Sequence, residues 1–274
     1  MRKLNRPKIG LALGSGGSKG LAHIGVIKVL EENNIPIDFI AGTSMGAMVG
    51  GCYASGLSIE KIEEIALDIT WRQLLALVDP NLKQGLLMGK KVKSFIESHL
   101  EGKQFENCRI PFSAVATDLR TGKSVVLTKG GMAEAIRASI SIPLVFKPIE
   151  IDGRTLADGG LSAPVPVDIV RNMGANIVIA VNLGKHCYDR KLEHGWYDIA
   201  NESLNIMCHH LSFYNTKEAD IVIEIDLRKD SWYKFVNGQD KIMIGEQAAK
   251  RILPQLKEAI LQRSKDGSNQ TVWE

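Results

Sequence analysis

Residues 37–50 are Ile37-Asp38-Phe39-Ile40-Ala41-Gly42-Thr43-Ser44-Met45-Gly46-Ala47-Met48-Val49-Gly50. A short apolar segment ends at Gly-x-Ser-x-Gly and is followed by a run of small residues. This order is typical of a nucleophile elbow, a sharp strand-to-helix turn that exposes one serine hydroxyl. The pattern makes Ser44 the candidate nucleophile, and the elbow around it is formed by Gly42, Thr43, Met45 and Gly46. Taken alone, the pentapeptide is equally compatible with a loop that has no catalytic role.

The residues before the elbow predict a strand, a glycine loop and a helix. Residues 8–13 are a short apolar segment, and the glycine-rich residues 14–20 interrupt it. Residues 21–33 then carry apolar side chains at helical spacing. With the strand of the elbow, these segments form a βαβ unit, and the ends of its two parallel strands lie at one edge of the sheet. We therefore expect the glycine loop and Ser44 to be neighbours.

The glycine loop does not fit either common nucleotide motif. A phosphate-binding P-loop needs Ser or Thr after the lysine, whereas Gly20 follows Lys19. A dinucleotide fingerprint that starts at Gly14 needs glycine in place of Lys19, and no acidic residue closes the next strand. Two interpretations remain: free N–H groups of Gly16 and Gly17 form an oxyanion hole beside the serine, or the loop serves packing only.

Residues 58–100 are predicted to be helical, with an interruption at 85–89. Their first part carries one apolar stripe, at positions 59, 62, 65, 66 and 69. A stripe of this kind favours a core helix. The alternative is that residues 70–90, which contain Pro80 and two glycines, form a mobile cap over an apolar pocket.

An aspartate follows the next group of predicted strands. Residues 112–117 and 124–127 predict two strands, residues 132–139 a short helix, and residues 148–157 a hairpin. Asp158-Gly159-Gly160 comes directly after this hairpin. The carboxylate is positioned to face a cleft, although Asp-Gly is more commonly a turn.

The C-terminal part continues the alternation of strands and helices. Helices are predicted at residues 164–173, 197–215 and 241–262, and strands at 176–182 and 219–225. The pattern predicts an α/β fold, a single three-layer domain over residues 1–263 with a mostly parallel central sheet. Residues 264–274 are polar and are expected to form a loose tail.

Composition narrows the class of protein. The 274 residues are 45% hydrophobic, and a net charge of +3 arises from interspersed charges of both signs, which argues against a nucleic-acid-binding protein. Mild attraction to anionic lipid surfaces stays open. The first apolar run, residues 9–13, is too short for a signal peptide or a membrane span, so a cytoplasmic protein is expected.

No cofactor or metal is predicted. The four cysteines, Cys52, Cys108, Cys187 and Cys208, have no paired spacing that would indicate zinc or disulfides. The sequence also lacks a carboxylate cluster of the calcium-loop form.

Together, the motifs resemble those of the patatin-like phospholipases, in their small bacterial form. The family's glycine loop is matched by Gly16-Gly17-Ser18-Lys19-Gly20, its elbow by residues 42–46, and its Asp-Gly-Gly motif by residues 158–160. An Ala-Ser-x-x-x-Pro block is matched by residues 138–143. All four occur in the family's order within residues 8–182. One departure is Ser15, which stands where the family's loop usually begins with glycine.

The resemblance implies a Ser44–Asp158 catalytic dyad, with Gly159 and Gly160 completing the Asp-Gly-Gly motif. It also implies an oxyanion hole in the loop of Gly16, Gly17, Ser18 and Lys19. A histidine triad would need His186, His194, His209 or His210, none of which follows a strand end in an obvious catalytic loop. We interpret His23 as structural. Because a free aspartate has a pKa near about 3.9, an apolar site should raise the pKa of Asp158.

The expected substrate, again by resemblance, is an acyl ester of a lipid such as a phospholipid or lysophospholipid. Apolar residues 71–87 would line its acyl channel. Transient contact with a membrane surface, peripheral at the inner membrane, would follow from such a substrate. The alternative is a non-catalytic regulatory scaffold that binds a protein partner. The sequence does not indicate an oligomeric state.

Overall fold

A computed structural model describes residues 6–68, 80–81, 86–184, 195–227 and 237–269. The strands are β1 (Ile9–Leu13), β2 (Phe39–Thr43), β3 (Pro80–Asn81), β4 (Leu86–Leu87), β5 (Phe112–Asp118), β6 (Ser124–Leu127), β7 (Ile149–Ile151), β8 (Arg154–Asp158), β9 (Ile177–Asn182) and β10 (Ile221–Glu224). The α-helices are α1 (Ala22–Glu32), α2 (Met45–Ala54), α3 (Ile59–Asp68), α5 (Lys90–Leu100), α6 (Met132–Ser139), α7 (Val167–Asn172), α8 (Trp196–Asn215) and α9 (Gly238–Asn269). Short 3-10 turns are η1 (Gly17–Leu21), η2 (Phe105–Asn107), η3 (Gly159–Leu161) and η4 (Thr216–Glu218).

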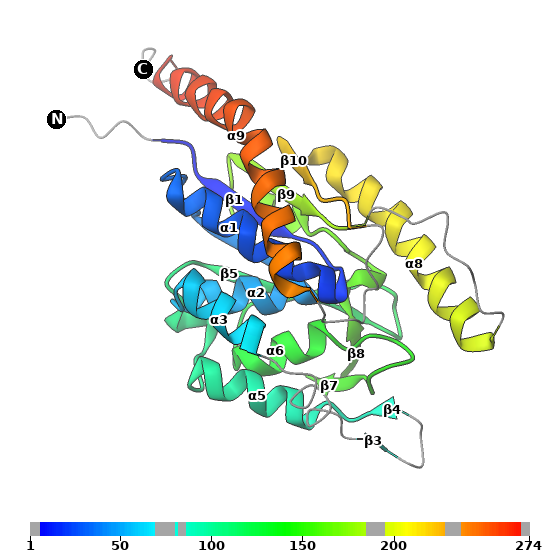
Figure 1. The fold of residues 1–274 in the computed structure, drawn as a ribbon. Coiled ribbons are helices and arrows are strands. Elements are labelled where there is room, and N and C mark those ends of the chain that lie inside the picture. The colour runs from blue at the N-terminus through cyan, green and yellow to red at the C-terminus, as the bar shows by residue number, and fades with distance from the viewer. Residues whose placement is uncertain (1–5, 69–79, 82–85, 185–194, 228–236, 270–274) are drawn as a thin grey trace.

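The central sheet has the strand order β10-β9-β1-β2-β5-β8-β7, and β6 also pairs with β5 (Figure 1). Strands β10, β9, β1, β2 and β5 are parallel to one another. Strands β6 and β8 run antiparallel to β5, and β7 runs antiparallel to β8. The fold is therefore α/β with a mostly parallel sheet, and the predicted β1-α1-β2 unit is present.

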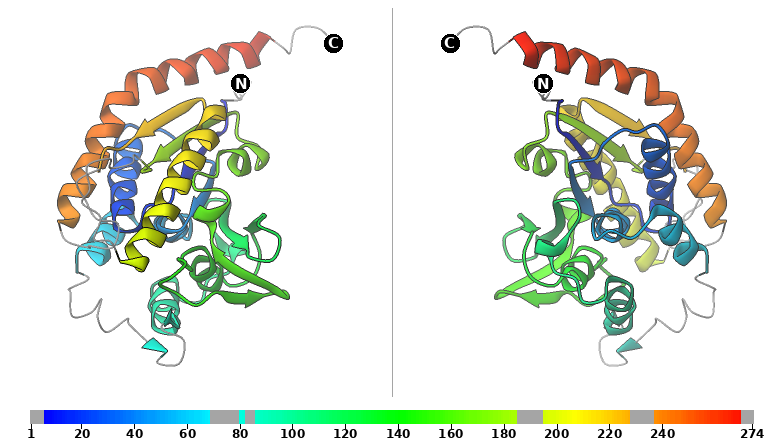
Figure 2. Two further views of the ribbon diagram at one scale, coloured as in Figure 1. Left: turned by 90° about the vertical axis from the view of Figure 1, so that its right-hand side faces the viewer. Right: turned by 90° about the vertical axis from the view of Figure 1, so that its left-hand side faces the viewer.

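Alternating side chains explain why helices cover both faces of the sheet (Figure 2). In β1, Ile9, Leu11 and Leu13 point into the larger core, which contains α1, α2 and α9. Ala12 points to the other face, against α7. A Cβ atom at Gly10 would lie 2.1 Å from the side chain of Val170 on α7. Small residues on this face thus allow α7 to approach the sheet closely.

The prediction of helix over residues 58–100 with an interruption at 85–89 is confirmed by α3 and α5 and is wrong at Pro80–Asn81. Helix α3 ends at Asp68, β3 and β4 form a short antiparallel pair, and α5 begins at Lys90. The reason lies in tertiary hydrogen bonding, because Leu87 exchanges backbone hydrogen bonds with Val145 and Lys147 at 2.9 and 2.8 Å. Residues 69–79 and 82–85 lie outside the described residues, as does most of the suggested cap and channel.

Two helix boundaries also differ from the prediction. Helix α7 begins at Val167 rather than at residue 164, because Pro164 and Pro166 lack N–H groups and Pro166 disfavours helical geometry at Val165. Helix α9 extends over Gly238–Asn269 and continues through Pro254. The expectation of a loose tail from residue 264 is therefore wrong for residues 264–269, and residues 270–274 lie outside the described part.

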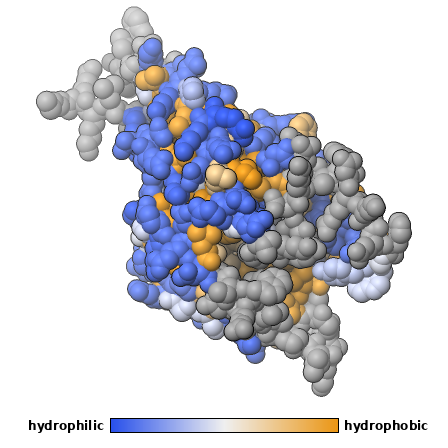
Figure 3. Space-filling model, viewed as in Figure 1, coloured by the Kyte–Doolittle hydropathy of each residue, from blue (hydrophilic) through white to orange (hydrophobic). Residues whose placement is uncertain are grey.

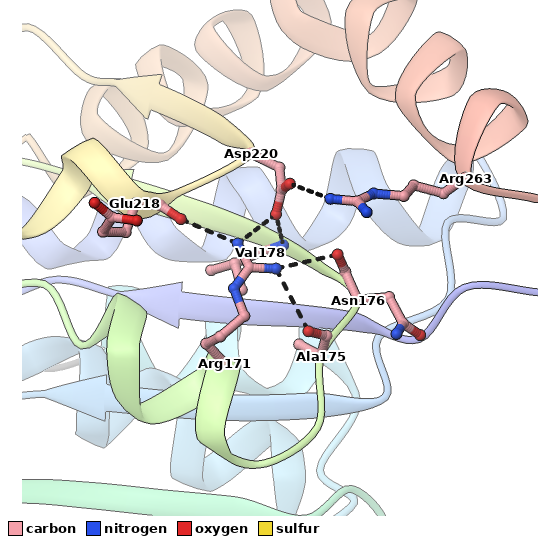
Figure 4. A network of polar contacts seen from close by, with 7 residues as sticks. All are labelled: Arg171, Ala175, Asn176, Val178, Glu218, Asp220 and Arg263. Atoms are coloured by element: carbon pink, nitrogen blue, oxygen red, sulfur yellow. Dashed lines mark hydrogen bonds and ion pairs between the residues drawn. The ribbon is translucent and has the colours of Figure 1, made fainter. Parts of the chain in front are cut away.

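A polar network joins α7, β9, β10 and α9 at the edge of the sheet where β9 and β10 begin (Figure 4). The carboxylate of Asp220 accepts hydrogen bonds from Arg171 at 2.6 Å, from the N–H of Val178 at 2.8 Å and from Arg263 at 3.4 Å. Burial alone would raise the pKa of Asp220, but the bonds from Val178 and Arg171 outweigh it and lower the pKa. The network holds the far part of α9 against the sheet.

The surface over α1, α3 and α9 is mainly hydrophilic, with scattered apolar residues (Figure 3). Across the described ranges, each helix is too short or too polar to pass through a lipid bilayer.

Candidate active site

Ser44 occupies a strained turn between β2 and α2. Its backbone has φ 55° and ψ −121°, which a residue with a side chain adopts only at a cost. A Cβ atom at Gly42 would lie 2.4 Å from the carbonyl oxygen of Gly46, and one at Gly46 would lie 2.1 Å from that of Leu13. Both glycines are therefore required where α2 packs against β1 and β2, as the elbow motif predicted.

Side chains from other elements hold this turn in place. The hydroxyl of Ser139, at the end of α6, accepts a hydrogen bond from the N–H of Ser44 at 2.8 Å and donates one to the carbonyl of Val115 at 2.6 Å. The hydroxyl of Thr43 donates to the carbonyl of Ala163 at 2.7 Å. Ser139 belongs to the Ala-Ser-x-x-x-Pro block, but its role could not be predicted because nothing in the sequence shows where α6 lies.

The sheet register brings Asp158 to Ser44. Thr43 at the end of β2 pairs with Val115 of β5, and the adjacent Ala116 pairs with Asp158 at the end of β8. Strand β8 runs antiparallel to β5, pairs with its carboxyl-terminal residues and ends opposite Ala116, so that Asp158 lies next to the carboxyl end of β2. Gly159 lies across from Val115, where a Cβ atom would be 2.2 Å from the carbonyl oxygen of Val115. The Asp-Gly dipeptide thus needs its glycine for a close backbone contact.

The Ser44 hydroxyl donates a hydrogen bond of 2.6 Å to Oδ2 of Asp158. The other carboxylate oxygen, Oδ1, accepts the N–H of Gly160 at 2.7 Å. Both residues are buried, with 3% of Ser44 and 5% of Asp158 exposed. Burial raises the pKa of Asp158 to about 6, against the opposing effect of the hydrogen bonds from Ser44 and Gly160. The arrangement is a serine hydroxyl joined to a carboxylate that accepts protons near neutral pH.

The glycine loop lies directly against the elbow. A Cβ atom at Gly20 would lie 2.2 Å from the side chain of Met45, and one at Gly46 would lie 2.8 Å from the carbonyl oxygen of Gly14. Nε2–H of the buried His23 donates to that same carbonyl at 2.8 Å. Burial lowers the pKa of His23 to about 4, so its imidazole is neutral at physiological pH. His23 is thus a structural residue that holds the loop.

The loop turns at Gly17, whose φ of 55° lies in the left-handed region that glycine adopts without strain. No hydrogen bond from the N–H of Gly16 or Gly17 is found within the described residues. The N–H of Lys19 donates to the carbonyl of Gly16 at 3.2 Å. The hydroxyl of Ser18 accepts a hydrogen bond from Nζ of Lys241 at 3.2 Å.

Lys241 was missed by the sequence analysis. It lies on α9, 223 residues from Ser18, and its side chain is buried, with 1% exposed. No sequence motif marks this residue. A signal could have come only from the unusual placement of a lysine on the apolar side of α9, beside Ile242.

No histidine hydrogen-bonds to Ser44 or Asp158 among the described residues. His209 bonds instead to the carbonyl of Gly184, and His186 and His194 lie outside the described ranges. The thiol of Cys208, on α8, donates to the carbonyl of Gly160 at 3.2 Å. Burial, helped by the negative charge of Asp158, raises the pKa of Cys208 to about 11 and keeps the thiol protonated.

Within the part of the chain that the structure describes, no group of three or more His, Cys, Asp or Glu side chains is arranged to hold a metal ion. The described cysteines Cys52, Cys108 and Cys208 are free thiols.

The model of the family described as patatin-like phospholipase matches residues 11–171, which is more than half of the chain. The chain belongs to the patatin-like phospholipase family. An uncharacterized NTE family protein of Mycobacterium tuberculosis is 44% identical over 184 residues, which cover 67% of this chain and 51% of the relative. The human patatin-like phospholipase domain-containing protein 6 is 33% identical over 191 residues, which cover 67% of this chain and 14% of the relative. The chain thus matches about half of the mycobacterial relative and a small part of the human one.

Two solved structures share the fold of this family member. VipD from Legionella pneumophila aligns with a TM-score of 0.52 and 13% identity over 91% of this chain and 67% of that one. ExoU of Pseudomonas aeruginosa, in complex with SpcU, aligns with a TM-score of 0.53 and 14% identity over 93% of this chain and 53% of that one. At these identities the likeness extends to the fold alone.

Proposed function

We propose that this chain hydrolyses acyl esters of lipids through an acyl-enzyme on Ser44, with Asp158 as the general base. The Ser44 proton passes to Asp158 as Oγ attacks the ester carbonyl carbon. When the tetrahedral intermediate collapses, the C–O bond to the leaving alcohol breaks and Asp158 returns the proton to that alcohol. Water, deprotonated by Asp158, then attacks the acyl-enzyme, and the carboxylic acid leaves as Ser44 regains its proton.

The observation that carries this proposal is the 2.6 Å hydrogen bond from Ser44 to Asp158, made from a strained nucleophile turn. The raised pKa of Asp158 supports its role, because a base works best when its pKa lies near the working pH. A structural hydrogen bond alone would not require Ser44 to adopt a positive φ.

Stabilisation of the oxyanion is assigned to the glycine loop. Its residues are Gly16, Gly17, Ser18 and Lys19, and the N–H groups of Gly16 and Gly17 are the proposed donors. Two observations support this assignment: no hydrogen bond within the described residues engages these two groups, and the loop contacts the elbow at Gly20 and Gly14. Preorganised N–H donors of this kind each contribute about a hundredfold or more to the rate.

The substrate class follows from the family. Its description, and that of the human relative, names phospholipase, and we assign this chain a lipid ester on that basis. The head group and the acyl length are to be determined by a screen of esters of increasing chain length.

The test is labelling of the purified protein with a fluorophosphonate, together with ester hydrolysis. We expect labelling of the wild type and none of Ser44→Ala, with a fall in hydrolysis of at least about a thousandfold. Asp158→Asn should lose about a hundredfold to ten-thousandfold. Ser98→Ala, at an exposed serine on α5, is the control that should behave as the wild type. An unlabelled wild type with no ester turnover would overturn the proposal and favour a non-catalytic scaffold.

A further inference from the structure

Ser15 is a residue of the glycine loop for which the proposed mechanism has no role so far. It stands where the family's loop usually begins with glycine, so its hydroxyl is an addition to the motif. The backbone on which it sits is fixed, because the N–H of Ser15 donates to the carbonyl of Pro164 at 2.8 Å and that of Gly14 donates to the carbonyl of Val181 at 3.1 Å. The Ser15 side chain therefore starts from a defined position.

The hydroxyl of Ser15 lies beside the carboxylate of Asp158. A Cβ atom at Gly160 would be 3.0 Å from Oδ1 of Asp158 and 3.3 Å from Oγ of Ser15, so both oxygens are within reach of one point. Within the part of the chain that the structure describes, the Ser15 hydroxyl makes no hydrogen bond, either to this carboxylate or to another group. Two polar groups so placed, without a direct bond, can be joined by one bridging water molecule.

The carboxylate of Asp158 can accept a hydrogen bond from such a water molecule. Each carboxylate oxygen has two lone pairs, and the N–H of Gly160 uses one of those on Oδ1. The Ser44 hydroxyl donates to Oδ2. Once Ser44 is acylated, its oxygen carries no proton and this second donor is lost. The carboxylate then needs a new donor, and in ester hydrolysis that donor is the attacking water.

Ser15 also lies where solvent reaches the site. Ser44 and Asp158 are buried, whereas Ser15 is partly exposed, as are the two glycines that follow it in the loop. Water can therefore bind at Ser15 without displacing the buried Ser44–Asp158 pair.

We propose that Ser15 orients the water molecule that hydrolyses the acyl-enzyme. The water donates one O–H to Asp158 and the other to Oγ of Ser15, which leaves a lone pair free to attack the acyl carbon. As the new C–O bond forms, the first proton passes to Asp158. When the intermediate collapses, the bond from the acyl carbon to Oγ of Ser44 breaks and Ser44 takes this proton back. Ser15 forms no covalent bond and keeps its own proton. The inference deepens the proposed function and rests on it.

The test measures the two halves of the reaction separately in Ser15→Ala, which removes the hydroxyl and keeps Cβ. In rapid mixing with p-nitrophenyl butyrate, nitrophenolate release reports acylation, and the intact mass of quenched protein reports formation and decay of the acyl-enzyme. We expect acylation within about twofold of the wild type and deacylation slower by about tenfold, because an unoriented water attacks less often. Acyl-enzyme should accumulate during turnover. Ser98→Ala, at the exposed serine on α5, is the control that should change neither step.

Ser15→Gly is the second variant, and it should slow deacylation as much as Ser15→Ala does, because both lack the hydroxyl. A loss confined to Ser15→Gly would assign the effect to backbone freedom and contradict the role of the hydroxyl. Equal slowing of acylation and deacylation in Ser15→Ala, or a shift in the pH profile of its acylation, would show that Ser15 acts on Asp158 or on the loop instead of on the water. Unchanged deacylation in Ser15→Ala would also overturn the proposal.

The same measurements distinguish a failure of this inference from a failure of the proposed function. A wild type that forms no acyl-enzyme and does not hydrolyse the ester would remove the proposed function, and the role of Ser15 with it. A normal acyl-enzyme that decays at the wild-type rate in Ser15→Ala would remove only the role of Ser15.

Discussion

The hydroxyl of Ser139 accepts the backbone N–H of Ser44 at 2.8 Å and donates to the carbonyl of Val115 at 2.6 Å. One side chain, 95 residues from the elbow, thus connects the nucleophile turn to strand β5. A strained turn persists only when its surroundings hold it, and Ser139 supplies part of that hold.

Ser139→Ala should therefore destabilise the protein and misplace Ser44. We expect a loss of about 1–3 kcal/mol in the free energy of unfolding, because a buried N–H and a buried carbonyl lose their partner. Ester turnover should fall by about tenfold or more. Urea unfolding and kcat/KM measure the two effects. Ser113→Ala, at a buried serine whose hydroxyl donates to the sulfur of Met173, is the control and should keep its activity.

The raised pKa of Asp158 predicts the pH dependence of hydrolysis. The carboxylate must be ionised to accept the Ser44 proton, and its pKa is about 6. The rate constant kcat/KM should therefore rise with pH, by about tenfold per unit below this pKa, and level off above it. A soluble ester is the suitable substrate for the profile. A profile that is flat from acid to neutral pH would exclude Asp158 as the base.

Asp158→Asn should raise stability while it removes activity. The folded carboxyl keeps its proton up to a pKa of about 6, whereas the unfolded one releases it near about 3.9. Wild-type stability therefore declines as the pH rises between these values and stays lower above them. The neutral amide avoids this cost, which is on the order of 3 kcal/mol. Thermal unfolding should show a higher Tm for the variant near about pH 8, and the gap should shrink towards about pH 4.

Gly46→Ala should prevent normal packing of the elbow. Its Cβ atom would lie 2.1 Å from the carbonyl oxygen of Leu13, a backbone atom that cannot turn away. We expect a loss of about 3 kcal/mol in the free energy of unfolding, or failure to give soluble protein. Gly131→Ala is the control, since a Cβ atom there meets nothing within 4 Å and its φ is −72°. It should change the free energy of unfolding by less than about 1 kcal/mol.

Lys241→Met should slow hydrolysis by disturbing the glycine loop. Lys241 donates to Ser18 within that loop, and methionine keeps much of its length without the donor. We expect kcat to fall by about tenfold with little change in KM, because the loop acts on the transition state. Lys250→Met is the control for the loss of a lysine from α9, because Lys250 lies on the same helix with a 56% exposed side chain. Equal effects of the two substitutions would show that Lys241 has no such role.

The sequence by itself determined the β1-α1-β2 unit and the elbow. Apolar runs of strand length separated by glycines leave few alternatives, and the right-handed crossover places the glycine loop beside Ser44. The glycines of the elbow could be identified in advance because a strained turn and a close helix exclude side chains locally. Local residue patterns also predicted the hairpin before Asp158 and the short helix α6 with nearly their observed bounds.

Only the tertiary structure decided how Asp158 reaches Ser44, since β8 pairs antiparallel with β5 and no pattern within β8 encodes its neighbour or direction. The same holds for Ser139, Lys241 and Cys208, which contact the site from three separate helices. It also holds for β3 and β4, which pair with each other while Leu87 bonds to the backbone of Val145 and Lys147. The physical reason is common to all of them. Local patterns fix backbone conformation, whereas hydrogen bonds across 48 to 223 residues form only once the sheet order is complete.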